Sequence, residues 1–137
     1  MYRYKVYVDR VVDGDTVDVD IDLGFGMIYK KQRVRMMGID TPESRTRDLV
    51  EKFYGKASKA FLVEQLEGQE IQLVSHDKGK FGRILGELFV GASAYSINQM
   101  MIDHHNAVPN TRASKELVEE QHLANRQRLK EQGLQPE

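Results

Sequence analysis

Strict alternation of apolar and acidic residues between Thr16 and Leu23 is the feature that most limits how this chain can fold. The apolar positions are Val17, Val19, Ile21 and Leu23, and the acidic positions between them are Asp18, Asp20 and Asp22. Because side chains of a β-strand point alternately to its two faces, a strand here collects all the apolar residues on one side. The pattern therefore predicts a strand with its apolar face on a core and its acidic face in water.

The rest of the chain predicts short strands and three helices around this strand. Strands are expected over 4–12, 16–23, 28–39, 71–74 and 83–90, and helices over 48–67, 94–105 and 114–132, with Pro109 breaking the chain over 107–110. The apolar stripe expected on the first helix is Leu49, Phe53, Ala57, Ala60 with Phe61, and Leu66. A helix between the third and fourth of five strands is the order of an OB-fold. We therefore predict an α+β fold: a five-stranded OB-fold β-barrel with three α-helices.

Length and composition indicate one domain over residues 1–137. The chain has 137 residues, 40% of them hydrophobic, which is enough to bury a core without covalent cross-links. It has no cysteine, which excludes disulfides, thiolate metal sites and a thiol nucleophile. No stretch has the length of a signal peptide or a membrane span. We therefore expect a monomer that does not bind a membrane, and an intracellular location is favoured.

Local charge, rather than net charge, indicates an anionic partner. The net charge is only −1, but residues 28–60 hold nine lysines and arginines against four aspartates and glutamates. Local potential steers a charged ligand, so this segment would attract a polyanion such as DNA or RNA. A basic face exposed to water without a ligand is the alternative explanation of the same pattern.

Three polar clusters at predicted strand ends carry the residues suited to chemistry: 13–17, 35–43 and 80–83. Hydrolysis of a phosphodiester needs positive charge against the phosphoryl oxygens and a group that orients or deprotonates water. Asp15, Asp40 and the Thr41 carbonyl are hard oxygen ligands of the kind that Ca²⁺ prefers. Glu43 adds a carboxylate. Arg35 and Arg83 add planar guanidinium groups that match phosphate.

The clusters read D-G-D-T-V, R-x₄-D-T-P-E and K-F-G-R in chain order, and this ordered triple resembles the signature of the staphylococcal nuclease family. The similarity extends at lower specificity over about residues 6–130. It implies an OB-fold nuclease domain that cuts DNA and RNA and leaves a 3′-phosphate and a 5′-hydroxyl. It also implies a calcium ion bound by Asp15, Asp40 and the main-chain oxygen of Thr41.

The same resemblance assigns catalytic and substrate-binding roles. Glu43 would orient or deprotonate the attacking water, and Arg35 and Arg83 would stabilise the transition state. Phe81 would stack on the substrate, and Lys78 and Lys80, which frame the third cluster, are candidates for phosphate contacts, although a solvated loop explains these two lysines equally well. Asp13 and Arg33 are interpreted as structural, and His122 as an ordinary helix residue.

The chain also departs from the family pattern. Phe81 stands where the family usually has tyrosine, so a ring is kept but its hydroxyl is lost. The tyrosines that the family places after its second helix have no counterpart over 103–112. A base stacked on an aromatic ring contributes roughly 1–3 kcal/mol, so we expect weaker substrate binding. Two alternatives stay open: an OB-fold module that binds nucleic acid or protein without cutting it, and a calcium-stabilised domain with no nucleic-acid role.

Overall fold

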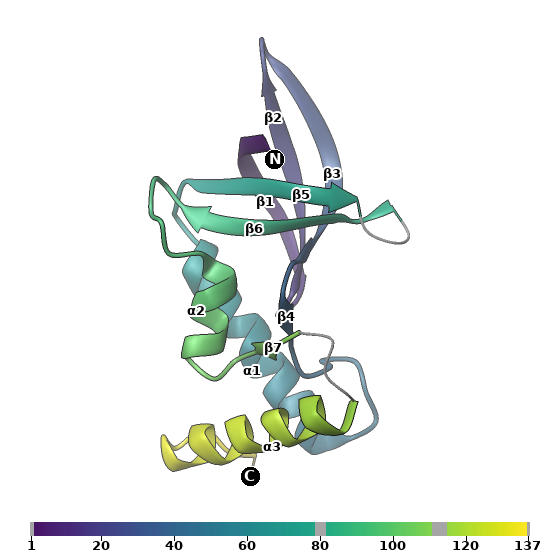
Figure 1. Ribbon diagram of the computed structural model, residues 1–137, viewed down its shortest axis with the longest axis vertical. Helices are drawn as coiled ribbons and strands as arrows, with labels where there is room; N and C mark the ends of the chain where they lie inside the picture. The colour runs from purple at the N-terminus through teal and green to yellow at the C-terminus, as the bar shows by residue number, and fades with distance from the viewer. Residues whose placement is uncertain (1, 79–81, 111–114, 137) are drawn as a thin grey trace.

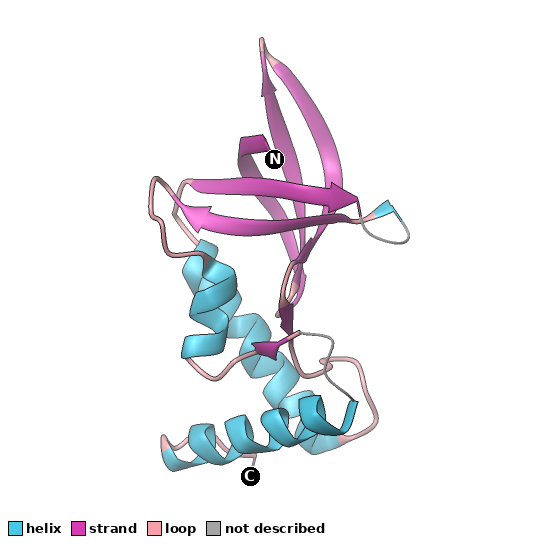
Figure 2. Ribbon diagram, viewed as in Figure 1, coloured by secondary structure: helices cyan, strands magenta, loops and turns pink. Residues whose placement is uncertain are grey.

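The computed structural model describes residues 2–78, 82–110 and 115–136. Its strands and helices, in chain order, are β1 (Tyr2–Asp13), β2 (Thr16–Gly24), β3 (Met27–Met36), β4 (Ile39–Asp40), α1 (Leu49–Leu66), β5 (Ile71–Lys78), β6 (Ile84–Val90), α2 (Ile97–Asp103), β7 (Val108–Pro109) and α3 (Lys115–Glu131). The strands of the barrel gather in one half of the molecule and the helices in the other (Figure 2).

Five strands close into a barrel in the order β1-β2-β3-β6-β5 (Figure 1). All neighbours are antiparallel except β3 and β6, which pair in parallel. The parallel pair is possible because α1 and β5 lie between these two strands in the sequence and carry the chain across. The closed barrel with three helices confirms the predicted OB-fold architecture.

The core lies inside the barrel and continues towards the helices. Val17, Val19 and Ile21 of β2 are buried, as their alternation predicts. Leu23, which was expected on the same apolar face, is instead 44% exposed. The reason is that the hairpin of β2 and β3 projects beyond the barrel, where no layer covers it (Figure 1). The sequence pattern identified the face of the strand but not the point at which the barrel ends.

The predicted strand over 28–39 is two strands in the structure. β3 ends at Met36, and β4 begins at Ile39 after a turn in which Gly38 has a φ of 81°. Only glycine adopts this left-handed conformation without strain, so the chain changes direction there. β4 then pairs with β7, which lies in the segment over 107–110 that was predicted only to break a helix. Pro109 is tolerated because this two-stranded sheet is very short.

The buried face of helix α1 overlaps the predicted stripe only in part, at Leu66. Its buried residues are Tyr54, Gly55, Ser58, Leu62 and Leu66, whereas Leu49 of the expected stripe is 77% exposed. Small residues set this face, because a Cβ added at Gly55 would overlap the main chain of Glu43 and Ser44. Close packing on that loop therefore decided the orientation of the helix. Asp48 caps its N-terminus by accepting from the N–H groups of Val50 and Glu51.

Helix α2 is shorter than the predicted span of 94–105, because Ser96 caps its N-terminus and the helix ends at Asp103. Helix α3 occupies the predicted region, and β5 is longer than predicted, running to Lys78. No helix in the described parts of the chain has the length and apolar character needed to cross a membrane.

The buried side chain of Asn98 joins α2 to the barrel. Its Oδ1 accepts from Leu88 N, and its Nδ2 donates to Met37 O and Gly86 O. Truncation removes the side-chain partner of Leu88 N and of Met37 O, whereas Gly86 O still accepts from Met37 N, so Asn98→Ala should destabilise the fold by about 2–4 kcal/mol. Urea unfolding measures this, with Gln99→Ala, an exposed neighbour, as the control. Equal stability of the two variants would contradict the role given to Asn98.

Candidate active site

Strand pairing brings the first two polar clusters together at one end of the barrel. Thr16 pairs with Arg35 across β2 and β3, and the N–H of Met36 donates to the carbonyl of Asp15 over 2.8 Å. Asp40 ends β4, two residues beyond the turn that follows β3. The two segments thus meet because they sit at the ends of neighbouring strands, although residues 18–34 lie between them in the sequence.

The side chains of Asp15 and Asp40 converge on one nitrogen of Arg35. Arg35 Nη2 lies 3.4 Å from Asp15 Oδ2 and 3.9 Å from Asp40 Oδ1. Asp15 and Arg35 expose only 13% and 16% of their side chains, whereas Asp40 exposes 38%. Because Asp15 and Arg35 are shielded from water, their attraction is screened less than that of a surface ion pair. The group is a charged centre, open to solvent on the Asp40 side.

Hydrogen bonds to the main chain hold this centre in place. Arg35 Nη1 donates to Met36 O and Nη2 donates to Ile39 O, each over 2.9 Å. Asp15 Oδ2 accepts from Thr41 N over 3.3 Å, and Asp15 Oδ1 accepts from the Thr16 hydroxyl over 2.9 Å. The guanidinium therefore bridges the turn around Gly38, and Asp15 holds the start of the loop at Thr41.

Glu43 lies in a negative environment on that loop. Partial burial and the nearby charges of Asp13, Asp15, Glu51 and Asp40 raise the pKa of its carboxyl group above the usual range. Asp13 itself accepts a hydrogen bond from Ser44 Oγ, so it fixes the loop directly after Glu43. A carboxylate with a raised pKa, among other acidic side chains, is suited to accept a proton from water.

His122 is a member of the site that sequence analysis missed. Its Nε2 lies 2.8 Å from Asp40 Oδ2, which joins α3 to the end of β4. Both side chains line a cavity of about 440 Å³, together with Glu51 and Arg126. The contact spans 82 positions in the chain. No local pattern distinguishes His122 from other polar residues of its helix, so only the tertiary structure reveals it.

The third cluster is only partly described. Arg83 is half-buried and directly precedes β6, whose parallel pairing places Ile84 beside Val34 and Leu85 beside Arg35. The start of β6 therefore lies next to the end of β3 that carries Arg35. Lys78 ends β5, but its side chain lies outside the described part of the structure, as do Lys80 and Phe81.

Arg33 behaves as the structural residue that sequence analysis expected. Its guanidinium donates to both carboxylate oxygens of Asp18, over 2.8 and 3.1 Å, across β2 and β3. Arg33 thus neutralises the charge of Asp18 on the barrel surface. Arg35, two residues along the same strand, instead takes part in the charged centre.

The donor set fits a hard cation only in part. Asp15, Asp40 and the Thr41 carbonyl are all oxygen donors, which suit calcium or magnesium rather than a soft metal. Within the described residues, however, no group of three or more histidines, cysteines, aspartates or glutamates is arranged to hold a metal ion. An ion here would have two carboxylates and one carbonyl, and water or phosphate oxygens would supply its other ligands.

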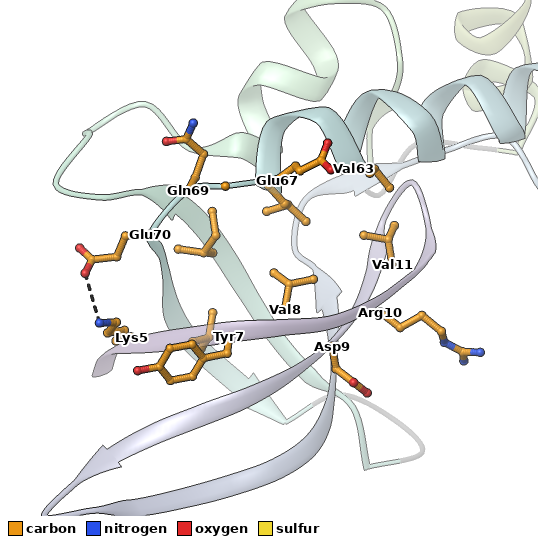
Figure 3. Close-up of a pocket in the computed structure, with 14 residues that line it drawn as sticks. Lys5, Tyr7, Val8, Asp9, Arg10, Val11, Val63, Glu67, Gln69 and Glu70 are labelled. Carbon is orange, nitrogen blue, oxygen red and sulfur yellow. Dashed lines mark ion pairs between the residues drawn. The ribbon is translucent and has the colours of Figure 1, made fainter.

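A groove of about 710 Å³ lies elsewhere on the molecule, between β1 and the C-terminal end of α1. Val8 and Val11 of β1 face Val63 of α1 across it, and Lys5 pairs with Glu70 at one end (Figure 3). None of the candidate site residues lines this groove.

Comparison with known proteins identifies the family of this chain. A model of the family described as "Staphylococcal nuclease homologue" matches residues 33–132. The chain is 35% identical over 95 residues to a thermonuclease of Staphylococcus hyicus, an alignment that covers 68% of this chain and 52% of that protein. It is 34% identical over 92 residues to a thermonuclease of Staphylococcus intermedius, covering 66% and 51%.

An uncharacterized endonuclease of Escherichia coli is 30% identical over 95 residues, covering 69% of this chain and 54% of that protein. The chain thus spans about half the length of each of these relatives. The family match covers most of the chain, including Arg35, Asp40 and Glu43. The chain belongs to the staphylococcal nuclease family.

Proposed function

We propose that this protein is a calcium-dependent nuclease that hydrolyses phosphodiester bonds of DNA or RNA. The observation that carries the proposal is the convergence of Asp15 and Asp40 on Arg35 Nη2. Glu43 lies on the loop that directly follows Asp40, and Asp15 and Asp40 are among the charges that raise the pKa of its carboxyl group. Relatives named thermonuclease and endonuclease support the same activity. The centre combines oxygen donors, an arginine and a candidate base, which are the groups that this reaction needs.

Asp15, Asp40 and the main-chain oxygen of Thr41 are the residues that would hold calcium. Asp15 and Asp40 lie together at one guanidinium nitrogen, and burial and the acidic residues around Glu43 raise the pKa of its carboxyl group. This concentration of negative charge is one that a divalent cation would relieve. When bound, the ion supplies positive charge against the phosphoryl oxygens. His122 contacts one oxygen of Asp40, and Asp40 Oδ1, on the Arg35 side, is the oxygen we assign to the cation.

Glu43 orients the attacking water and accepts its proton. The water oxygen forms a bond to phosphorus as the bond between phosphorus and the 5′ oxygen breaks. The leaving 5′ oxygen takes up a proton from solvent water, so the products are a 3′-phosphate and a 5′-hydroxyl. Arg35 and Arg83 donate to the phosphoryl oxygens, where negative charge builds in the transition state. Arg35 can do so while keeping its bonds to Met36 O and Ile39 O, because a guanidinium has five N–H groups.

The third cluster, residues 80–83, and the neighbouring Lys78 would contribute to substrate binding away from the reacting phosphate. Lys78 and Lys80 would neutralise neighbouring phosphates, and Phe81 would stack on a base or sugar. Without the phenolic hydroxyl that a tyrosine would bring, Phe81 offers only its ring face.

Cleavage should require calcium. We expect the protein to cut single-stranded DNA in the presence of millimolar CaCl₂ and to leave it intact in EGTA, as measured by denaturing gel electrophoresis. End-labelling of the products checks for the 3′-phosphate. Binding of the DNA without cleavage in calcium would contradict the proposal and favour a binding module. A melting temperature that rises with calcium, with neither binding nor cleavage, would favour a domain that calcium only stabilises.

Arg83→Lys should lower kcat/KM by about 100-fold or more while the fold survives. Lysine keeps the charge but not the planar pair of donors that matches two phosphoryl oxygens. Initial rates on a fluorogenic oligonucleotide measure this, with circular dichroism as the check on folding. Arg33→Lys is the matched control, because Arg33 is engaged by Asp18 and has no role in the proposed reaction. Full activity of the Arg83 variant would remove Arg83 from the mechanism.

Glu43→Gln should abolish most activity and, in EGTA at pH 7, raise the melting temperature. The pKa of Glu43 is raised above its ordinary value of 4.5, so the folded protein holds the proton to a higher pH than the unfolded chain does. The free energy of unfolding therefore falls as pH rises through the range just above 4.5 and stays lower at neutral pH. Replacement by glutamine removes this loss.

Scanning calorimetry between pH 4 and 8 tests the effect on stability. The difference between Glu43→Gln and the native protein should be present at neutral pH and should disappear as the pH falls to about 4. Glu64→Gln, which removes the same charge from an exposed position of α1, should leave the melting temperature nearly unchanged. A Glu43 variant that is less stable than the native protein at pH 7 would contradict the assignment of unfavourable charge.

A further inference from the structure

A strongly basic pocket lies between the loop that follows Glu43 and the first half of α1. Its volume is about 560 Å³. Five of its seven lining residues are cationic, and none is acidic: Arg45, Arg47, Lys52, Lys56 and Lys59, with Ser44 and Thr46 between them. In a chain whose net charge is −1, this concentration of positive charge in one concave surface is not a consequence of composition.

Helix geometry and one glycine bring these cations together. Lys52, Lys56 and Lys59 follow the i, i+4, i+7 spacing and so lie on one face of α1. Gly55 lies on the same face and packs directly against the main chain of Glu43 and Ser44. The lysine face therefore lies beside the loop that carries Arg45 and Arg47. The pocket begins at Ser44, directly after Glu43 of the candidate active site.

The five cations have no partners that explain their position. Among the residues that the structure describes, none of the five takes part in an ion pair, whereas Arg33, Lys5 and Arg126 each have an acidic partner. Like charges at i, i+4 spacing destabilise a helix. The cluster thus works slightly against folding, and an anionic ligand would reverse this cost.

We infer that this basic pocket binds the phosphate groups of the nucleic-acid strand on one side of the scissile bond. The inference rests on the proposed function, because it places the strand that is cut at Glu43. Guanidinium forks and ammonium groups are the usual partners of phosphate oxygens, and they bind the backbone without reading the bases. The pocket anchors the strand through its phosphates, in a protein that lacks the family's tyrosines over 103–112.

The salt dependence of binding tests this pocket. The probe is a fluorescein-labelled dodecathymidylate in EGTA, and its dissociation constant is measured by fluorescence anisotropy over a series of NaCl concentrations. Each phosphate contact on a single strand contributes about 0.7 to the slope of log affinity against log salt concentration. The triple variant K52Q/K56Q/K59Q should therefore bind more weakly, with a slope shallower by about 2.

A matched triple variant separates this pocket from a general effect of charge. K30Q/K31Q/K130Q removes the same charge at exposed positions that do not line the pocket. Its slope should stay close to that of the native protein. If the lysine variant of α1 fails to fold, as judged by circular dichroism, R45Q/R47Q repeats the test at two exposed positions on the loop, with an expected change of about 1.4.

The possible results distinguish the pocket from the proposed reaction. An unchanged slope in the pocket variants, equal slopes in pocket and control variants, or no binding of the oligonucleotide by the native protein would each overturn the inference. Calcium-dependent cleavage with an unchanged slope would overturn the pocket but keep the nuclease. Binding that depends on the pocket lysines, without cleavage in calcium, would keep the pocket and overturn the nuclease.

Discussion

The contact of Asp15 and Asp40 with Arg35 is the interaction on which the site depends. It joins the turn after β1, the end of β3 and the end of β4, and the main-chain bonds of Arg35 hold the turn around Gly38 between them. Removal of the arginine would leave two carboxylates close together without a counter-charge, one of them largely shielded from water. The barrel provides the rigid strand ends, and this charged centre joins them into one site.

Helix α1 and the loop before it extend this centre. Gly55 allows the helix to approach the main chain of Glu43, and Ser58 lies against Gly14 in the turn beside Asp15. The same loop also lines the basic pocket, with Ser44, Arg45, Thr46 and Arg47. A nucleic-acid strand could thus meet oxygen donors for a cation at the reacting phosphate and lysines and arginines at the phosphates beyond it. The unfavourable charge on Glu43 and among the lysines is a cost in stability that the proposed ligands would relieve.

Much of the barrel could be predicted from the sequence because alternation is a local property. The buried face of β2 follows from Val17, Val19 and Ile21 alone, and Asp48 marks the start of α1 through its capping chemistry. Predictions were wrong where packing set the outcome. The buried face of α1 keeps Leu66 of the predicted stripe but leaves Leu49 in solvent and buries Gly55 and Ser58, because a helix that packs on a loop at close range needs small residues there.

The sequence by itself determined the residue types of the candidate site, the order of its three segments and the alternation that makes strands of the chain around them. Only the tertiary structure decided which charges meet: Asp15 and Asp40 at one nitrogen of Arg35, His122 at Asp40, and five cations in the pocket beside Glu43. The physical reason is the range of the interactions. Helix capping and hydrophobic periodicity depend on residues close together in the sequence, whereas contacts between residues up to 82 positions apart depend on how closed strands and a close-packed helix bring them together.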